Sequence, residues 1–152
     1  MDIIDYKRSW EQLKIRAEEE CRDARGKRQE RWKKAMTAIQ ESIDFLELPA
    51  ALETMALEQY KAAVKEDRNP PSVYDDPRLN WARVQKIAES EIKVSSGSRR
   101  NLWIAFHQTV VALNDSIKDF SKLEKESSKA YREASNNKDI HAPPKLRIVS
   151  GD

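Results

Sequence analysis

The chain has 152 residues, of which 36% are charged and 39% hydrophobic, and its formal net charge at pH 7 is +2. This length fits one domain, and so high a charged fraction favours slender helices with one buried stripe each over a thick core buried on all sides. A net charge so close to zero does not by itself indicate a nucleic acid or another polyanion as the partner.

The sequence has none of the marks of a secreted or membrane protein. Its first five residues include two acids and no base, whereas a signal peptide starts with a basic segment followed by an apolar one. No apolar run approaches the ~20 residues that cross a bilayer as a helix. The single cysteine, Cys21, excludes an internal disulfide and is typical of a reducing compartment. We therefore expect a soluble intracellular protein, located in the cytoplasm.

The first expected helix covers residues 5–47. Gly26 is the only glycine in this range and no proline occurs there, although these two residue types are the usual helix breakers. If the helix breaks at Gly26 instead, five shorter helices would fold together. Five apolar residues near its end follow the four-three spacing of a two-stranded coiled-coil seam: Trp32, Met36, Ile39, Ile43 and Leu46. Pro49 cannot donate a helical hydrogen bond, so we expect the helix to end before it.

Two shorter helices are expected in the middle of the chain. The first covers residues 50–67 and is followed by a proline-containing loop. The second begins at Pro77 or Arg78 with Asp76 as its N-cap, because proline fits the first helical position and aspartate accepts hydrogen bonds from free N–H groups. The turn at residues 95–98 is expected to end it.

The last expected helix covers residues 99–135, which contain neither glycine nor proline. It has the most regular apolar stripe in the chain: Phe106, Val110, Leu113, Ile117 and Phe120. Residues 136–152 contain two adjacent prolines and no helical period. We expect them to form a flexible or loosely docked tail on a helical bundle made of residues 1–135.

These helices predict an all-α fold: an antiparallel helical bundle of about four helices with long first and last helices, partly coiled-coil. At 1.5 Å per residue the outer helices would reach roughly 55–60 Å, against about 25 Å for each inner helix. Two short helices cannot cover two long ones, so the excess length would form a coiled coil or pack against a second copy. The lengths therefore favour a homodimer.

The clearest local pattern is a reversal of charge. Residues 22–34 contain seven basic and two acidic side chains, whereas residues 35–59 contain five acids and no base. The seven bases are Arg22, Arg25, Lys27, Arg28, Arg31, Lys33 and Lys34. Because Trp32 lies among them, this stretch could bind phosphates and stack on a base. Alternatively, it is a solvated surface whose cations meet acids on a neighbouring subunit.

A second basic pair, Arg99 and Arg100, lies at the start of the last expected helix. Cations there oppose the helix dipole, so local stability does not favour them. They either contact a partner or are simply solvated.

The four tryptophans divide by their surroundings in the sequence. Trp10 and Trp103 lie near strong apolar stripes and are expected in the core. Trp32 lies amid cations and Trp81 near a helix start, so these two are the candidates for exposed interface anchors. For all four, core or subunit contacts are favoured over ligand binding.

No cluster in the sequence predicts catalysis or metal binding. His107 has no acid, cysteine or second histidine at helical ligand spacing, and the Glu-x-x-His pattern of di-iron bundles does not occur. Cys21 has no identifiable base to activate it, and the three glycines are too far apart to form a phosphate-binding loop. We therefore expect no enzymatic activity, no metal and no cofactor.

No residue pattern is specific enough to indicate a family. Amphipathic helices without a chemical site favour a non-enzymatic protein–protein interaction module: an oligomerising scaffold, an adaptor or a small regulator, with another protein or itself as partner. The alternative is a nucleic-acid-binding protein that uses the basic stretch. The candidate partner- or phosphate-binding residues are Arg22, Arg25, Lys27, Arg28, Arg31, Trp32, Lys33, Lys34, Arg99 and Arg100.

Overall fold

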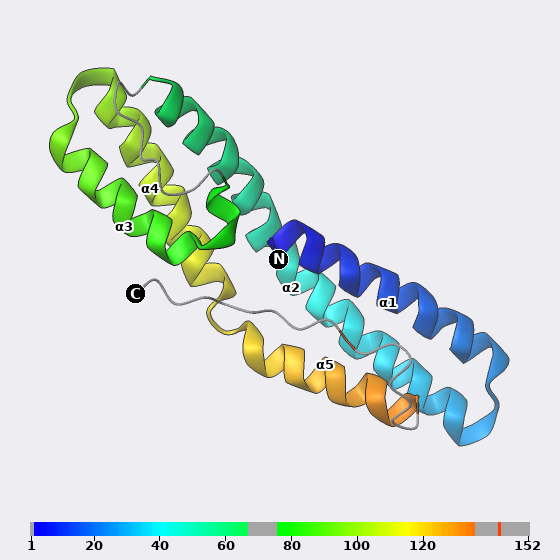
Figure 1. The fold of residues 1–152 in the computed structure, drawn as a ribbon. Coiled ribbons are helices and arrows are strands. Elements are labelled where there is room, and N and C mark those ends of the chain that lie inside the picture. The colour runs from blue at the N-terminus through cyan, green and yellow to red at the C-terminus, as the bar shows by residue number, and fades with distance from the viewer. Residues whose placement is uncertain (1, 67–75, 136–142, 144–152) are drawn as a thin grey trace. The chain divides into compact units, whose positions relative to one another are not determined.

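The computed structural model describes residues 2–66, 76–135 and 143, and these are helical apart from short turns (Figure 1). The helices are α1 (Ile3–Asp23), α2 (Gly26–Lys65), α3 (Trp81–Val94), α4 (Gly97–Ile117) and α5 (Phe120–Ala134), and a 3₁₀ turn, η1 (Pro77–Leu79), precedes α3. No strand occurs in this part of the chain, so the all-α prediction is confirmed. No helix in it is long and apolar enough to span a membrane. The predicted tail, residue 143 apart, lies outside the described residues.

The chain divides into two compact units, and α2 contributes to both. Among the described residues, the first unit contains 2–3, 48–66 and 76–117, which include the second part of α2 with η1, α3 and α4. The second unit contains 4–47, 118–135 and 143, which include α1 from its second residue on, the first part of α2 and α5.

The predicted helix over residues 5–47 is wrong, because the chain turns at Gly26. Helix α1 ends at Asp23, and α2 begins at Gly26, whose φ of +61° lies in the left-handed region that glycine adopts without strain. The side-chain amide of Gln29 donates to the carbonyl of Cys21 across this turn at 3.0 Å. Gly26 thus redirects the chain so that the start of α2 folds back beside α1.

The predicted break at Pro49 is also wrong, since α2 runs through this residue. A proline inside a helix removes one hydrogen bond and costs ~3 kcal/mol or more. Pro49 is itself buried, so tertiary packing rather than helix propensity maintains the helix here. The expected helix over residues 50–67 is therefore the second part of α2.

The predicted helix over residues 99–135 is interrupted as well, at Lys118 and Asp119, where no glycine or proline marks a break. The predicted apolar stripe is nevertheless confirmed as core, because all five of its residues are buried. Both of the predicted long helices are divided, although α2 itself has 40 residues, and the homodimer stays a prediction. The described residues form five α-helices, where about four were expected.

In the second unit, α5 runs antiparallel to the first part of α2. The Phe120 ring lies 5.4 Å from that of Phe45 and 5.7 Å from that of Tyr6 on α1. Further along, the hydroxyls of Ser42 and Ser127 are hydrogen-bonded at 2.6 Å. Ser127 is fully buried, so small polar residues take part in this helix contact.

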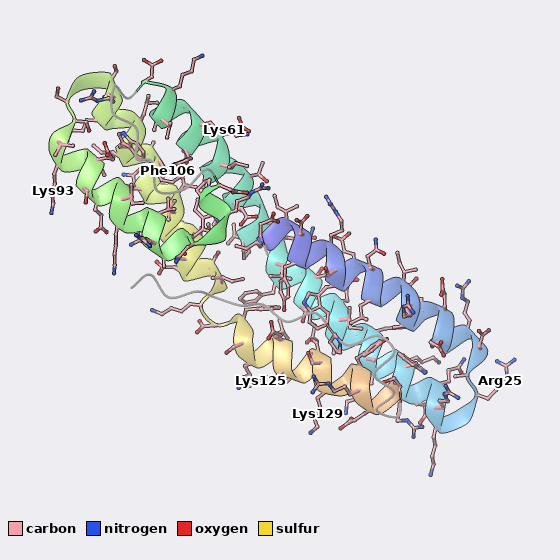
Figure 2. The ribbon with its side chains drawn as sticks, viewed as in Figure 1. Arg25, Lys61, Lys93, Phe106, Lys125 and Lys129 are labelled. Atoms are coloured by element: carbon pink, nitrogen blue, oxygen red, sulfur yellow. The ribbon has the colours of Figure 1, made fainter. Side chains whose placement is uncertain are left out.

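In the first unit, aromatic rings fill the space between the second part of α2, α3 and α4. Phe106, labelled in Figure 2, lies 5.3 Å from Tyr60, 5.8 Å from Trp103 and 6.3 Å from Trp81, measured between ring centroids. The N-cap prediction is confirmed, since Asp76 accepts a hydrogen bond from the backbone N–H of Arg78. The cap precedes η1, however, and α3 itself begins at Trp81.

Candidate functional site

The seven predicted cations lie around the turn between α1 and α2, in the second unit, and we name them together the basic turn. All seven are exposed: Arg22, Arg25, Lys27, Arg28, Arg31, Lys33 and Lys34. Figure 2 shows Arg25 projecting from the turn into solvent. Arg22 is in the last turn of α1, where a cation is favoured by the helix dipole. Lys27 and Arg28 are in the first turn of α2, where the dipole opposes them.

The cations of the basic turn are almost free of ion pairs. Arg28 lies 3.9 Å from the carboxylate of Glu20, and both side chains are about half exposed. Exposed pairs of this kind contribute roughly 0–1 kcal/mol. In the described part of the chain, the other six cations make no ion pair. They are therefore available to an acidic partner.

The expectation that Trp32 is an exposed contact residue is wrong. Its side chain is only 2% exposed, and its ring packs edge-on against Tyr131 of α5 at 5.6 Å. Trp32 lies on the face of α2 that packs against α5, whereas its charged neighbours are exposed to solvent. A ring buried in this way cannot stack on a nucleic-acid base.

Trp81 is also buried, at 7% exposure, which corrects the second prediction of an exposed tryptophan. Its indole N–H donates to Oε2 of Glu53 at 2.8 Å. Trp10 and Trp103, which were expected in the core, are fully buried as predicted.

An open groove of about 330 Å³ lies between α2 and α5 in the second unit. Its lining consists of Lys34, Ala38, Glu126, Lys129, Ala130 and Glu133. Lys34 belongs to the basic turn, so the groove begins where the basic turn ends. Lys129, which Figure 2 shows on α5, lies 4.0 Å from Glu133. Two lysines and two glutamates make the groove locally neutral, so it does not extend the positive field.

Arg99 and Arg100 occupy the first turn of α4, in the first unit, just after Gly97 with its φ of +63°. Arg100 is exposed and Arg99 is half-buried. They belong to a different unit from the basic turn, and we do not include them in one site with it.

The burial of Glu53 was not predicted, and its side chain is fully buried in the first unit. Its Oε2 accepts hydrogen bonds from the backbone N–H of Ile3, at 3.2 Å, and from Trp81. Glu53 lies on the buried stripe of α2, four residues after Pro49 and three before Ala56. This spacing is the signal that could have identified it.

An ionic cluster lies at the start of η1 in the same unit. Arg78 donates to Asp76 at 2.7 Å and lies 3.3 Å from the carboxylate of Asp2. The hydrogen bonds from Arg78 lower the pKa of Asp76 below its usual 3.8, and the same contact raises the pKa of Arg78. The cluster links Asp2 to η1.

Two further residues considered in the sequence analysis, His107 and Cys21, contact groups on neighbouring helices rather than forming a chemical site. His107 is half-buried, and its Nε2 lies 3.1 Å from Oε1 of Glu89 on α3, a contact that lowers the pKa of Glu89. The buried thiol of Cys21 faces the carbonyl of Gln29 at 3.9 Å, across the α1–α2 turn. Among the described residues, no group of three or more potential ligands could hold a metal ion.

Comparison with models of protein families, with curated proteins and with solved structures found no match to this chain. Any function must therefore be inferred from the surfaces described above. The basic turn is the most strongly charged of them.

Proposed function

We propose that this chain is a non-enzymatic protein–protein interaction module whose basic turn binds an acidic surface on a partner protein. The observation that carries the proposal is the burial of Trp32 beside seven exposed cations. Proteins that bind single-stranded nucleic acid combine a basic groove with aromatic rings on which bases stack. With Trp32 in the core, the basic turn offers charged side chains and no stacking surface.

The acids close to the basic turn favour a protein partner over a nucleic acid. Residues 18–34 contain seven bases and five acids, so their net charge is only +2. A polyanion is attracted mainly by the net positive field. A folded partner can instead match individual charges of both signs, which gives specificity even where the net charge is small. Whether the module acts as a scaffold, adaptor or regulator depends on that partner.

The alternative function is phosphate-backbone binding to nucleic acid, which the number of exposed cations favours. Such binding would require no aromatic contact. It would be strongly salt-dependent and almost independent of base sequence.

A charge-reversal variant with a matched control tests the proposal. The variant combines Arg25→Glu, Lys27→Glu and Arg31→Glu, all exposed and without an ion pair among the described residues. The control combines Lys118→Glu, Lys122→Glu and Lys125→Glu, which change the net charge equally at exposed positions of the same unit. A photo-crosslinking amino acid at position 27 identifies the partner, and fluorescence anisotropy measures the affinity of the purified pair.

We expect the variant to bind an acidic partner at least about tenfold more weakly, while the control binds as the unmodified protein does. Duplex DNA, single-stranded DNA and RNA are measured in parallel at physiological ionic strength. Salt-sensitive binding to one of them that only the basic-turn variant loses would assign the alternative function. Equal losses in both variants would contradict a specific site at this turn.

A further inference from the structure

We infer that the partner of the basic turn is a second copy of this chain, docked antiparallel along the exposed face of the first part of α2. The inference rests on the proposed function and names the partner of that same site. In the second unit, α2 carries both signs of charge: cations of the basic turn occupy its start, and three exposed acids follow them, Glu41, Asp44 and Glu47. A second copy therefore offers the acidic surface that the basic turn requires.

No cation within the second unit neutralises these three acids. After Lys34, the next basic residue of α2 is Lys61, so no base is interspersed with the acids along the helix. Within the described part of the chain, none of the three forms an ion pair. Asp44 accepts a hydrogen bond of 2.8 Å from the side chain of Gln40, but a neutral amide leaves the charge of the carboxylate in place. The acids are therefore as available to a partner as the cations of the basic turn.

The charges of both signs lie on one face of α2. Four exposed side chains follow the three-four spacing of a single helix face: Lys34, Thr37, Glu41 and Asp44. Arg31 and Glu47, also exposed, lie one turn beyond the two ends of this stripe. Near its middle, Thr37 is short, and the neighbouring Ala38 lines the open groove toward α5. These small side chains let a second helix approach closely, because the distance between packed helices depends on the side chains at the contact.

The order of the charges along α2 selects the antiparallel arrangement. Positions 31 and 47 are equally distant from position 39, and so are positions 34 and 44. A two-fold axis at position 39 therefore brings Arg31 of one copy opposite Glu47 of the other, and Lys34 opposite Asp44, and the symmetry repeats both pairs. A parallel arrangement in register would place cations opposite cations, and like charges across an interface are unfavourable. Residues 31–47 rise by about 24 Å, so the ion pairs are spread along the contact.

Charge-swap variants of the full chain test the inference. The base variant is Arg31→Glu with Lys34→Glu, and the acid variant is Asp44→Lys with Glu47→Lys. Their matched controls change the net charge equally at other exposed positions of the second unit: Lys122→Glu with Lys125→Glu, and Glu11→Lys with Glu19→Lys. Sedimentation equilibrium measures the dimer dissociation constant of each protein, and of the base and acid variants mixed in equal amounts. Circular dichroism verifies that each variant keeps its helicity.

We expect the unmodified chain and both controls to dimerise with a dissociation constant of about 1–100 μM at physiological ionic strength, and more weakly at high salt, because exposed ion pairs are individually weak and screened. Each swap variant alone should dimerise at least about tenfold more weakly. Mixing the two should restore the affinity, because every reversed cation then meets a reversed acid. A photo-crosslinking amino acid at position 37, close to the axis, should join two copies.

A monomeric unmodified chain would overturn the inference. So would a dimer that the swap variants do not weaken, or whose affinity mixing does not restore. Capture of a different acidic protein by the crosslinker at position 27 would overturn it as well, but would still support the proposed function. If the basic-turn variant lost no protein partner of either kind, the proposed function itself would fail.

Discussion

At the scale of single residues, Glu53 shows how a buried carboxylate can organise its surroundings. Its Oε2 accepts from a backbone N–H at the start of α1 and from the indole of Trp81 at the start of α3. Both donors are buried with it, and a buried donor that loses its acceptor costs about 1–3 kcal/mol. The acid is therefore a structural acceptor for two chain segments that meet in the first unit.

We expect Glu53→Ala to lower the free energy of unfolding by about 2–4 kcal/mol, because both donors lose their acceptor and a cavity forms. Glu53→Gln keeps a carbonyl oxygen and should cost less than half as much. Urea unfolding followed by circular dichroism measures both variants. A glutamine variant as unstable as the alanine variant would show that the charge matters and not the acceptor.

The tryptophans mark the limit of prediction at this scale. Trp10 and Trp103 could be assigned to the core because their apolar neighbours recur at helical spacing. The neighbours of Trp32 are charged, so its burial depends on a partner helix 99 residues away, at Tyr131. Sequence spacing locates the face of a helix, but it does not show which distant element covers that face. The exposure of the basic turn could be predicted without knowing which distant element packs against it.

At the scale of helices, Gly26 interrupts the range predicted as one helix, as the alternative of a break there allowed, whereas Pro49 does not end the helix that was expected to stop before it. Gly26 supplies a positive φ that other residues adopt only with strain, so its effect is local and predictable. The cost of Pro49 inside α2 is also local, but burial of the residue offsets it. The break at Lys118 and Asp119 has no local signal at all. The packing of Phe120 against Tyr6 and Phe45 holds the start of α5 in place.

We expect Gly26→Ala to destabilise the second unit by about 1–2 kcal/mol, because alanine is strained at positive φ. A Cβ added at Gly26 meets no atom within 4 Å, so the cost comes from the backbone alone. Gly26→Asn should cost less, since asparagine tolerates this conformation. Thermal unfolding compares the two variants. Equal losses would indicate that the side chain, and not the value of φ, determines the stability of the turn.

At the scale of the whole molecule, the described residues form two units with separate aromatic cores. The basic turn belongs to the second unit. The all-α class could be predicted because helix-forming composition and apolar periodicity act along the whole chain. The division into units could not, because it depends on which helix segments contact one another and on a helix that passes through Pro49.

The division predicts how a core substitution spreads through the molecule. Phe120 is 1% exposed in the core of the second unit. Phe120→Ala should therefore lower the stability of this unit by about 3–5 kcal/mol, through the lost ring contacts and the resulting cavity. Hydrogen exchange followed by mass spectrometry should show faster exchange in α1, α5 and the first part of α2. Peptides from α3 and α4 should keep their protection, because their aromatic cluster around Phe106 is intact. The matched variant Phe106→Ala should give the reverse pattern. If either substitution accelerated exchange equally in all five helices, the two units would unfold as one cooperative structure, and the partition of the chain would have no energetic meaning.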